Sequence, residues 1–315
     1  MHWGIWGTGS ICRQFAQDLP FAPDAIALAV ASRDLHRAWL FAQQHRIERC
    51  YGSYAELLAD PDIDIVYIGT PHSEHLANAG DAMRAGKHVL CEKPLTVTPQ
   101  ESQKLKQIQA ETGRYLMEAM WTWFLPAIIQ ARNWVSAGRI GSLRHIKADF
   151  GYPQRFDPTS RMYNPDLAGG CLLDMGVYPV ALSWMFHRRI PAEIKVVGRR
   201  ARSGVDDDFS AVLDYEGHVA TIGASFRCKL QNWAYIIGTE GYIALPDFWR
   251  ASEAMLYQLD TKIDHFSDDR LHQGFAYEAI AVQQDIAAGR CESETMSLDD
   301  SIAIQMIMDR IRQSI

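Results

Sequence analysis

The sequence predicts an α/β protein of two domains: a doubly wound parallel sheet, then an α/β domain with an open, mainly antiparallel sheet. Three observations support this prediction. Strand and helix patterns alternate over the first 120 residues, a glycine pair follows the first strand pattern, and strand follows strand between residues 192 and 245. At 315 residues the chain is long enough for two cores.

The first domain, residues 1–120, has strand patterns joined by helix patterns. The strands are expected at 2–6, 25–31, 50–51, 63–68, 87–91 and 114–118, and the helices at 11–19, 34–45, 54–59, 73–85 and 99–111. Strands connected through helices pair in parallel, and right-handed crossovers place helices on both faces of the sheet. Asp34 is a candidate N-cap, because its carboxylate can accept from free amides.

The second domain, residues 121–315, has a different rhythm. A helix pattern at 126–137 leads to a strand at 143–150, and another helix begins near Gly170. Strand patterns follow at 193–200, 209–215, 219–228 and 233–245, with Gly217, Gly238 and Gly241 at turns. Strands joined by short turns pair antiparallel. Helices at 272–288 and 298–314 end the pattern.

The composition excludes several classes of protein. The net charge of −7 gives no basic surface for nucleic acid phosphates. No uncharged apolar run approaches the roughly 20 residues of a membrane helix. The six cysteines form no CxxC pair, so we expect reduced thiols and no metal site. Since no secretory pattern opens the sequence, we expect a cytoplasmic protein.

A dinucleotide fingerprint opens the first domain and makes it a Rossmann-type domain. Gly7-Thr8-Gly9-Ser10-Ile11 follows a strand and begins a helix, which is the context that the motif requires. Gly7 permits the tight turn, Gly9 lets the backbone approach a pyrophosphate, and the helix start supplies amides. Cys12 stands at the third position, where its small thiol can still pack against the strand.

The end of the second strand favours NADP. An NAD site normally has an acidic residue there to hold the ribose diol, whereas this chain has Ser32 and Arg33, with Arg37 one helical turn later. A hydroxyl and guanidinium groups suit a 2′-phosphate. NAD is possible if Asp34 holds the ribose and the arginines are only solvated.

Two turns follow strands at the carboxyl edge of the sheet, where ligands bind in such folds. Thr70-Pro71-His72 follows the fourth long strand pattern, and His75 is either a cofactor contact or a packing histidine. Glu92-Lys93-Pro94 follows the next strand. Pro94 makes a rigid turn and biases Lys93 towards an extended conformation, which would aim its ammonium into the cleft beside a nicotinamide.

The second domain supplies further candidates. Asp174 and Tyr178 follow a Gly169-Gly170 pair and are four residues apart, so both lie on one helix face. A capping aspartate and a core tyrosine are the alternative. An aromatic substrate cleft would suit the apolar face of a sugar ring or a flat dihydrodiol. Its candidate residues are Trp121, Trp123, Phe150, Tyr152 and Tyr163.

These motifs together resemble the Gfo/Idh/MocA oxidoreductases, within them the branch of dimeric dihydrodiol dehydrogenase and NADP-linked D-xylose 1-dehydrogenase. The resemblance rests on the glycine loop, Thr70-Pro71-His72, Glu92-Lys93-Pro94, the run from Gly169 to Asp174, Ala31-Ser32-Arg33-Asp34, Glu118-Ala119-Met120-Trp121-Thr122 and Tyr178. It implies that Lys93 and Tyr178 are the catalytic pair with Asp174 nearby, and that the open sheet forms a homodimer. Trp123, where arginine is usual, and Cys171, in place of a third glycine, depart from the pattern.

The sequence therefore predicts an NADP-dependent dehydrogenase acting on CH–OH groups of a small-molecule sugar or diol. Tyr178 would exchange the hydroxyl proton, and because a free phenol has a pKa of roughly 10, Lys93 would favour its phenolate. Sugar oxidation, dihydrodiol oxidation and dicarbonyl reduction all stay open. The alternatives are a non-catalytic redox sensor that binds NADP(H) and an enzyme that keeps its cofactor bound between two substrates.

Overall fold

The chain divides into two compact units that are described separately here. The structure is a computed structural model, and it describes every residue from Met1 to Ile315. Unit 1 contains residues 1–121 and 271–301, and unit 2 contains residues 122–270 and 302–315.

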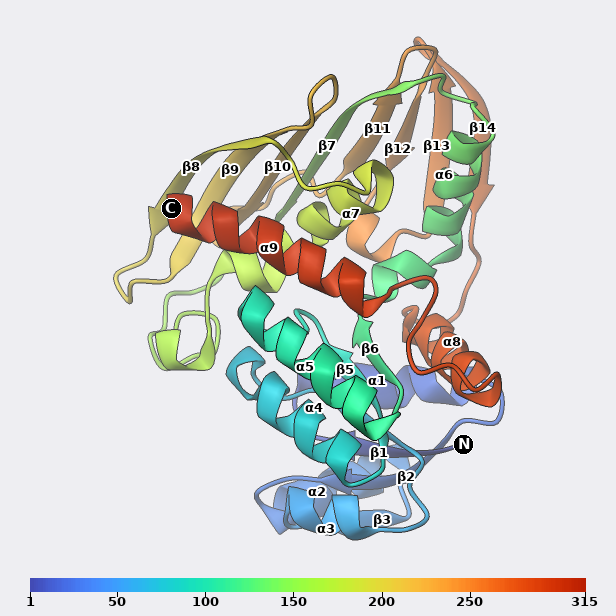
Figure 1. Cartoon of the computed structure of the whole chain (residues 1–315), viewed down its shortest axis with the longest axis vertical. Coiled ribbons are helices and arrows are strands. Elements are labelled where there is room, and N and C mark those ends of the chain that lie inside the picture. The colour runs from blue at the N-terminus through green and yellow to red at the C-terminus, as the bar shows by residue number, and fades with distance from the viewer. The chain divides into compact units, whose positions relative to one another are not determined.

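Unit 1 is built on a parallel six-stranded sheet, sheet A, in the order β3-β2-β1-β4-β5-β6 (Figure 1). Its strands are β1 (His2–Trp6), β2 (Ile26–Ala31), β3 (Arg49–Tyr51), β4 (Ile65–Ile68), β5 (His88–Glu92) and β6 (Leu116–Ala119). The order reverses at β1, so β2 and β4 flank it. The doubly wound parallel sheet predicted from the sequence is confirmed.

Helices cover both faces of sheet A. They are α1 (Ser10–Asp18), α2 (Leu35–His45), α3 (Tyr54–Ala59), α4 (His75–Arg84), α5 (Pro99–Thr112) and α8 (Phe275–Ala287), with short 3₁₀ turns η1 (Leu19–Phe21) and η2 (His72–Glu74). Alternate residues of each strand face opposite sides. Val66, Ile68 and Val89 join one apolar cluster with residues of α4 and α5, whereas Tyr67 stacks on Phe15 of α1.

Helix starts in unit 1 are fixed by local side chains. Asp34 caps α2, with its carboxylate accepting from the amides of His36 and Arg37, as the sequence predicts. Thr98 and Glu101 form a capping box at α5. These caps satisfy backbone donors that have no partner within the helix.

The segment 271–301 belongs to unit 1, whereas the sequence analysis placed it with residues 121–315. Helix α8 packs on α1, and Asp18 at the end of α1 accepts from the amides of Gly274 and Phe275 at its start. The ring of Trp121 stacks on Phe275 at 4.4 Å. These contacts join positions more than 150 residues apart in the sequence, and no local pattern reports them.

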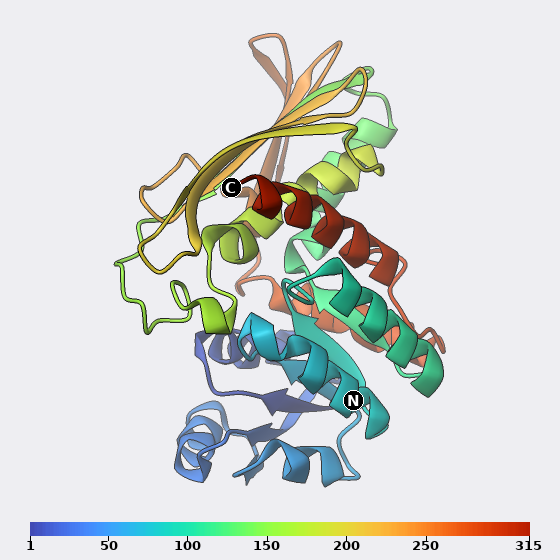
Figure 2. The same ribbon diagram turned by 60° about the vertical axis from the view of Figure 1, so that its left-hand side comes forward.

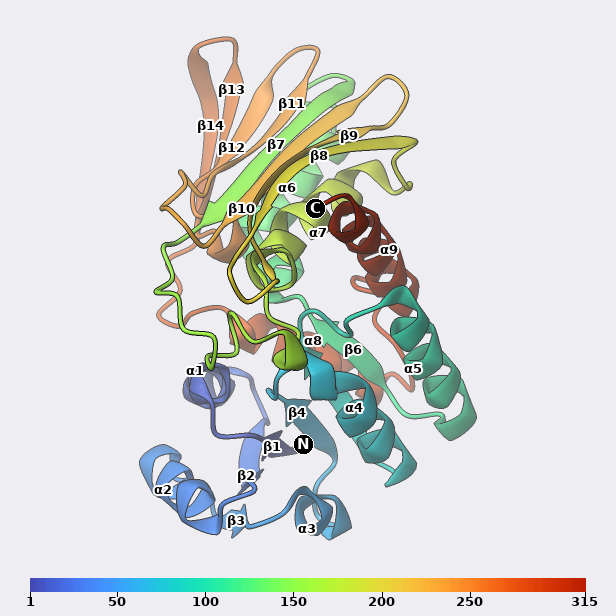
Figure 3. The same ribbon diagram turned by 90° about the vertical axis from the view of Figure 1, so that its left-hand side faces the viewer.

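Unit 2 is built on an eight-stranded sheet, sheet B, in the order β14-β13-β12-β11-β7-β10-β9-β8 (Figure 3). Its strands are β7 (Leu143–Gly151), β8 (Glu193–Arg200), β9 (Asp206–Asp214), β10 (Val219–Ser225), β11 (Ala234–Gly238), β12 (Tyr242–Leu245), β13 (Glu253–Gln258) and β14 (Thr261–Ser267). All neighbours pair antiparallel except β7 and β10, which are parallel. The open, mainly antiparallel sheet is confirmed.

One hairpin of sheet B agrees with the expected turns and one was not expected. The run at 233–245 forms the hairpin of β11 and β12, and its turn lies between Gly238 and Gly241, where the sequence predicted turns. The hairpin of β13 and β14 was not predicted. Its strands mix apolar and charged residues, as in Glu253–Gln258, and β14 is an exposed edge strand with little apolar character.

Helices α6 (Pro126–Ser136) and α7 (Val177–His187) pack on one face of sheet B (Figures 1 and 2). A π-helical turn, η5 (Leu172–Gly176), runs directly into α7, and 3₁₀ turns lie at η3 (Trp121–Phe124), η4 (Pro165–Leu167) and η6 (Phe248–Arg250). The last helix is α9 (Leu298–Ser314), and Arg310 on it donates to the carbonyl of Pro191. One stretch, Pro165–His187, has the length and apolarity of a membrane span, but 78% of its window is buried in the protein, as in a core helix.

Candidate functional site

The glycine loop at the carboxyl end of β1 leaves a helix start open to an anion. Gly7 has a φ of +121°, a conformation that favours glycine. Gly9 is the N-cap of α1, and no side chain caps that helix. The first amides of α1, at Ser10 and Ile11, therefore lack a side-chain acceptor, and Thr8 lies in the turn before them. This arrangement fits a pyrophosphate.

Cys12 fits at the third fingerprint position because Gly69 gives it room. The thiol is fully buried and lies 3.6 Å from the carbonyl oxygen of Gly69, to which it donates. A Cβ on Gly69 would overlap Cys12 Sγ and lie 3.1 Å from Ile11 Cγ2. Burial raises the pKa of the Cys12 thiol to about 12, so it stays neutral. The fingerprint usually has a glycine at position 12. Here Cys12 has a side chain, and the neighbouring Gly69 lacks one, so the space is kept.

At the end of β2, the carboxylate of Asp34 accepts hydrogen bonds from the start of α2. Besides capping α2, its carboxylate lies 3.6 Å from Arg37 Nε. Ser32 is buried, and its hydroxyl accepts from the Asp34 amide at 3.3 Å. Arg33 and Arg37 are exposed. Two exposed arginines thus follow a buried serine at this strand end, and their contact with a 2′-phosphate stays a prediction.

His75 ties together two turns at the carboxyl edge of sheet A. It is fully buried, with Nδ1 2.9 Å from the carbonyl oxygen of Pro94 and Nε2 3.0 Å from that of Thr70. Asn78, one turn later on α4, donates to Thr70 Oγ1 at 2.9 Å. Burial lowers the pKa of His75. In the structure His75 has the packing role that the sequence left open, and it positions Thr70 and the turn that includes Pro71; a direct cofactor contact stays a prediction.

Glu92 is anchored beneath Lys93. Its carboxylate accepts from the Tyr67 hydroxyl at 2.5 Å and from the Lys93 amide at 3.2 Å. The Lys93–Pro94 peptide is cis. Glu118 of β6 accepts from the Leu95 amide at 3.0 Å, and burial raises its pKa to about 7. Residues of three neighbouring strands therefore hold the turn that carries Lys93.

Glu278 is a buried acid without a partner in unit 1. Its side chain on α8 is fully buried, and neither carboxyl oxygen has a hydrogen-bond partner. Burial raises its pKa well above the ordinary value, with further increases from Glu92 and Asp18. Those two carboxylates accept from N–H or O–H donors, whereas Glu278 does not. Burial therefore favours the neutral form of Glu278, and no sequence signal marked this residue.

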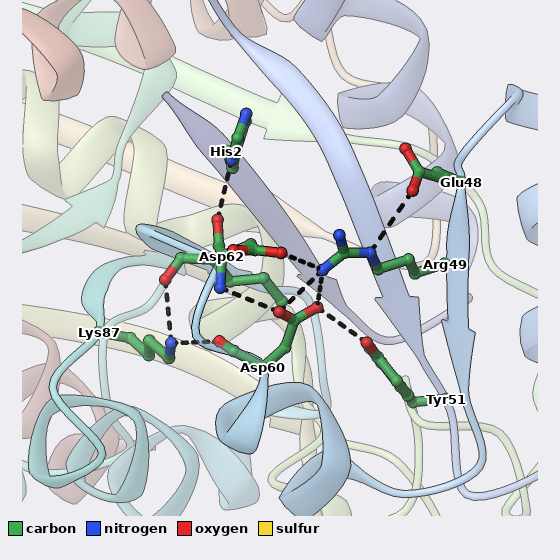
Figure 4. Close-up of polar contacts among 8 residues, drawn as sticks. His2, Glu48, Arg49, Tyr51, Asp60, Asp62 and Lys87 are labelled. Atoms are coloured by element: carbon green, nitrogen blue, oxygen red, sulfur yellow. Dashed lines mark hydrogen bonds and ion pairs between the residues drawn. The ribbon is translucent and has the colours of Figure 1, made fainter.

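A second charged cluster lies at the opposite, amino edge of sheet A (Figure 4). Arg49 donates to both carboxylate oxygens of buried Asp60 at 2.9 Å, and Tyr51 donates to it at 2.8 Å. Lys87 donates to the carbonyl of Asp60 at 2.6 Å. Ligands bind at the carboxyl edge in this fold, so this cluster stabilises the domain rather than forming a site. Its other members are His2, Glu48 and Asp62.

In unit 2, Asp174 and Tyr178 lie on the π turn and the helix that follows it. Asp174 is buried, and its Oδ1 accepts from Arg161 at 3.0 Å. Tyr178 is in the first turn of α7, also buried. The start of the π turn is held by Asp206, whose Oδ2 accepts from the Leu172 amide at 2.6 Å. Neither Arg161 nor Asp206 was predicted, because no local pattern links Arg161 to Asp174 or Asp206 to Leu172.

Phe150 connects Tyr178 to a layer of aromatic side chains. Phe150 meets Tyr178 edge to face at 5.5 Å and stacks on Trp249 at 4.2 Å. Tyr152 lies edge-on to both Phe150 and Trp249, and Lys229 Nζ lies 4.7 Å from the centre of the Tyr152 ring. The structure thus brings two predicted aromatics to the candidate base. Trp249 was missed, because it follows an unrelated hairpin.

The remaining predicted aromatics have separate packing partners. Trp121 belongs to unit 1, where it stacks on Phe275. Trp123 is fully buried under the Arg188 guanidinium, 5.1 Å from the ring centre. Tyr163 packs edge to face on Phe226 and donates to the carbonyl of Gln154. Substrate contacts by these three side chains stay predictions.

Comparison with known proteins identifies the family. Residues 1–120 match the family model of the oxidoreductase family with an NAD-binding Rossmann fold, and residues 128–244 match the GFO/IDH/MocA C-terminal domain. A trans-1,2-dihydrobenzene-1,2-diol dehydrogenase of Xenopus laevis is 37% identical, over 98% of this chain and 96% of that protein. The chain belongs to the Gfo/Idh/MocA oxidoreductase family.

Solved structures of similar proteins agree with this membership. A 3-ketoreductase from Actinomadura kijaniata, in complex with NADP and TDP-benzene, is 27% identical, with a TM-score of 0.88 over 100% of this chain and 97% of that one. An aldose-aldose oxidoreductase from Caulobacter crescentus has a TM-score of 0.90 at 23% identity, over 100% of this chain and 97% of that one, and shows the shared fold. As a Gfo/Idh/MocA protein, the chain is an oxidoreductase with a nicotinamide dinucleotide domain, and the predicted family, fold and enzyme class are confirmed.

Proposed function

We propose that this protein is an NADP-dependent dehydrogenase that oxidises a hydroxyl-bearing carbon of a flat, cyclic trans-diol. The aromatic layer of Phe150 and Trp249 beside Tyr178 is the observation that supports this substrate class most directly. A flat unsaturated ring stacks on such a layer over its whole face, whereas a sugar offers only the apolar side of its ring. The relatives that match the full chain are named for a dihydrobenzene diol, which favours the same class.

Tyr178 and Lys93 are the proposed catalytic pair. Tyr178 would take the hydroxyl proton of the substrate, and the Lys93 ammonium would favour the phenolate and polarise the substrate oxygen. Asp174, whose carboxylate accepts from Arg161, would orient the second hydroxyl of the diol. The nicotinamide, when bound, accepts the hydride from the substrate carbon. The proposal requires both residues to act on one substrate.

Cofactor choice rests on Ser32, Arg33 and Arg37. Since the Asp34 carboxylate caps the start of α2, we propose that the exposed guanidinium groups of Arg33 and Arg37 hold the 2′-phosphate of NADP. Replacing both arginines with alanine should raise the Kd for NADPH at least tenfold and leave the Kd for NADH unchanged, measured by fluorescence titration. Each lost charge-assisted hydrogen bond costs about 1.5–3 kcal/mol. An equal loss for both cofactors would contradict this assignment.

The experiment for the reaction is the initial rate of NADPH formation from a trans-dihydrodiol, with D-xylose and D-glucose as the comparison substrates. Tyr178→Phe and Lys93→Met should each abolish turnover while NADPH binding persists. Tyr152→Phe is the matched control, since it removes a phenol from the same aromatic layer. Full activity in Tyr178→Phe would refute the role of this residue. Turnover with the sugars alone would make a sugar the substrate class in place of the diol. Tight NADPH binding without turnover would favour the non-catalytic redox sensor.

We also propose that the outer face of sheet B joins two copies of the chain. Tyr235 pairs with Lys147 across β11 and β7, on the face opposite the buried Ile146 and Ala148. Tyr242 and Tyr257, next to it, stack at 4.8 Å. A partly exposed aromatic face of this kind is typical of an interface. Tyr257→Glu should convert a dimer to a monomer in light scattering, and a dimer unaffected by it would contradict the proposal.

The six unpaired cysteines support a reducing, cytoplasmic location.

A further inference from the structure

The helix that carries Tyr178 begins without a cap of its own. Its N-cap, Cys171, makes no capping hydrogen bond with its side chain. The acceptor comes from Asp206, the first residue of β9, whose Oδ2 lies 2.6 Å from the Leu172 amide nitrogen and 3.2 Å from Cys171 Sγ. Both groups donate to the same carboxylate oxygen. A residue 34 positions further along the chain therefore supplies the missing cap.

Gly170 is shaped to admit this carboxylate. Its φ is +126°, a conformation that side chains other than glycine rarely adopt. A Cβ at this position would overlap Asp206 Oδ1 and lie 3.1 Å from Asp206 Cγ. Gly170 and Asp206 thus depend on each other, because a side chain at the first position displaces the second.

Strand β9 also fixes the other end of the π turn. Gly176, the last residue of η5, packs against the Phe209 ring, where a Cβ would meet ring carbons at 2.8 and 2.9 Å. Asp206 and Phe209 therefore hold the first and last residues of a turn that has five residues. Tyr178 follows two positions later. A π turn is rare and shifts the register of every side chain after it, and such turns concentrate at functional sites.

Burying the Asp206 carboxylate costs free energy, and the need for a helix cap alone does not explain why this cost is kept. The side chain is buried, and no lysine or arginine donates a hydrogen bond to it. Burial raises its pKa, although the Leu172 amide, the Cys171 thiol, the amide of Asp206 itself and the charge of Arg200, its partner on β8, oppose this shift. A buried carboxylate without a bonded cation is unfavourable, whereas a neutral asparagine or serine caps a helix about as well. The cost points to a functional demand on this helix start.

We propose that Asp206 is a positioning residue that sets the π turn so that Tyr178 and Asp174 project from the helix in the register that catalysis requires. This inference rests on the proposed function. Asp206 touches neither reacting group and acts through the backbone of Leu172. We therefore expect that the position of Tyr178 depends on Asp206 and that the affinity for the cofactor does not.

The test compares Asp206→Leu, Asp206→Asn and Gly170→Ala, with Asp214→Leu as the control at the exposed far end of β9. A displacement of about 1 Å can cost roughly 100-fold in rate. We expect kcat to fall about 100-fold in Asp206→Leu and Gly170→Ala, with the Kd for NADPH within twofold of the native value. Asp206→Asn keeps an acceptor and should restore kcat to within about tenfold of the native value. Asp214→Leu should leave kcat unchanged.

Two further measurements separate this inference from the proposed function. In a Tyr178→Phe background, Asp206→Leu should still speed hydrogen exchange at residues 171–178, because the cap is made by Asp206 and the Leu172 amide. Hydrogen exchange of residues 171–178 should be faster in Asp206→Leu than in Asp214→Leu, a readout that needs no activity. An active Tyr178→Phe together with fast exchange would refute the proposed base and retain the positioning. Unchanged kcat and unchanged exchange in Asp206→Leu would overturn the inference; if that variant fails to fold, unchanged values in Gly170→Ala would do so.

Discussion

The contact between Gly69 and Cys12 makes a sharp prediction about the nucleotide domain. A Cβ on Gly69 would lie closer than 3.0 Å to Cys12 Sγ, a distance that real Cβ atoms essentially never show. It would also crowd Ile11 in the first turn of α1, at 3.1 Å. Gly69→Ala should therefore push α1 away from the strand ends and disturb the helix start that is the candidate pyrophosphate site.

The size of this effect follows from the packing. Neither neighbour is the free end of a long side chain, and Cys12 is fully buried. Overpacking of a rigid core costs about 1–3 kcal/mol, and Gly69→Ala should fall in the upper half of that range. For a domain of this size, roughly 2 kcal/mol lowers the Tm by about 4–8 °C. Cys12→Ala alone should cost about 1 kcal/mol, because it leaves a small void.

The assay is a double-mutant cycle in thermal unfolding, with NADPH titration in parallel. Gly69→Ala should be rescued by Cys12→Ala, giving a coupling energy of at least about 1 kcal/mol. Gly52→Ala is the matched control, since its Cβ would lie 3.3 Å from Leu35 Cβ, a tight contact that a shift of a few tenths of an ångström relieves. The reasoning is refuted if Gly69→Ala is as stable as Gly52→Ala, or if its cost is unchanged in the Cys12→Ala background.

Three other predictions concern buried ionisable groups. Asp60→Asn should destabilise unit 1 by about 1.5–3 kcal/mol at pH 7, because Arg49 loses a charge-assisted hydrogen-bond partner but keeps Glu48 and Asp62. Burial raises the pKa of Asp60, but its bonds to Arg49, the Asp62 amide and Tyr51 outweigh burial and lower the pKa. In urea unfolding, the difference in stability between the native protein and Asp60→Asn should therefore vanish as the pH falls below about 4. A difference that persists in acid would contradict this. Glu278→Gln should stabilise the protein by about 1–3 kcal/mol at pH 8. Since a raised folded pKa makes Glu278 lose stability as the pH rises, the gain should shrink towards pH 4, and a gain independent of pH would count against a neutral acid. Iodoacetamide at pH 8 should modify the exposed Cys228 and spare Cys12 by mass spectrometry, and equal labelling would disprove the burial of Cys12.

The sequence by itself determined the architecture of the first domain and which residues stand at the ends of its strands. Short apolar runs and helical patterns gave the strand and helix order of residues 1–120, because each is a property of consecutive residues. The same locality made the Asp34 cap and the Gly7 turn predictable. The strand-end positions of Lys93 and Thr70 followed from the parallel sheet, in which strand ends gather at one edge.

The tertiary structure alone decided which distant side chains complete these motifs. Gly69 makes room for Cys12, Asp206 caps the helix of Tyr178, and Trp249 stacks behind Phe150. Helix α8, remote in sequence, covers a face of the first sheet and buries Glu278 there. Each of these contacts joins residues dozens of positions apart. No local pattern encodes such a contact, because it arises only when the packed chain fixes which surfaces meet.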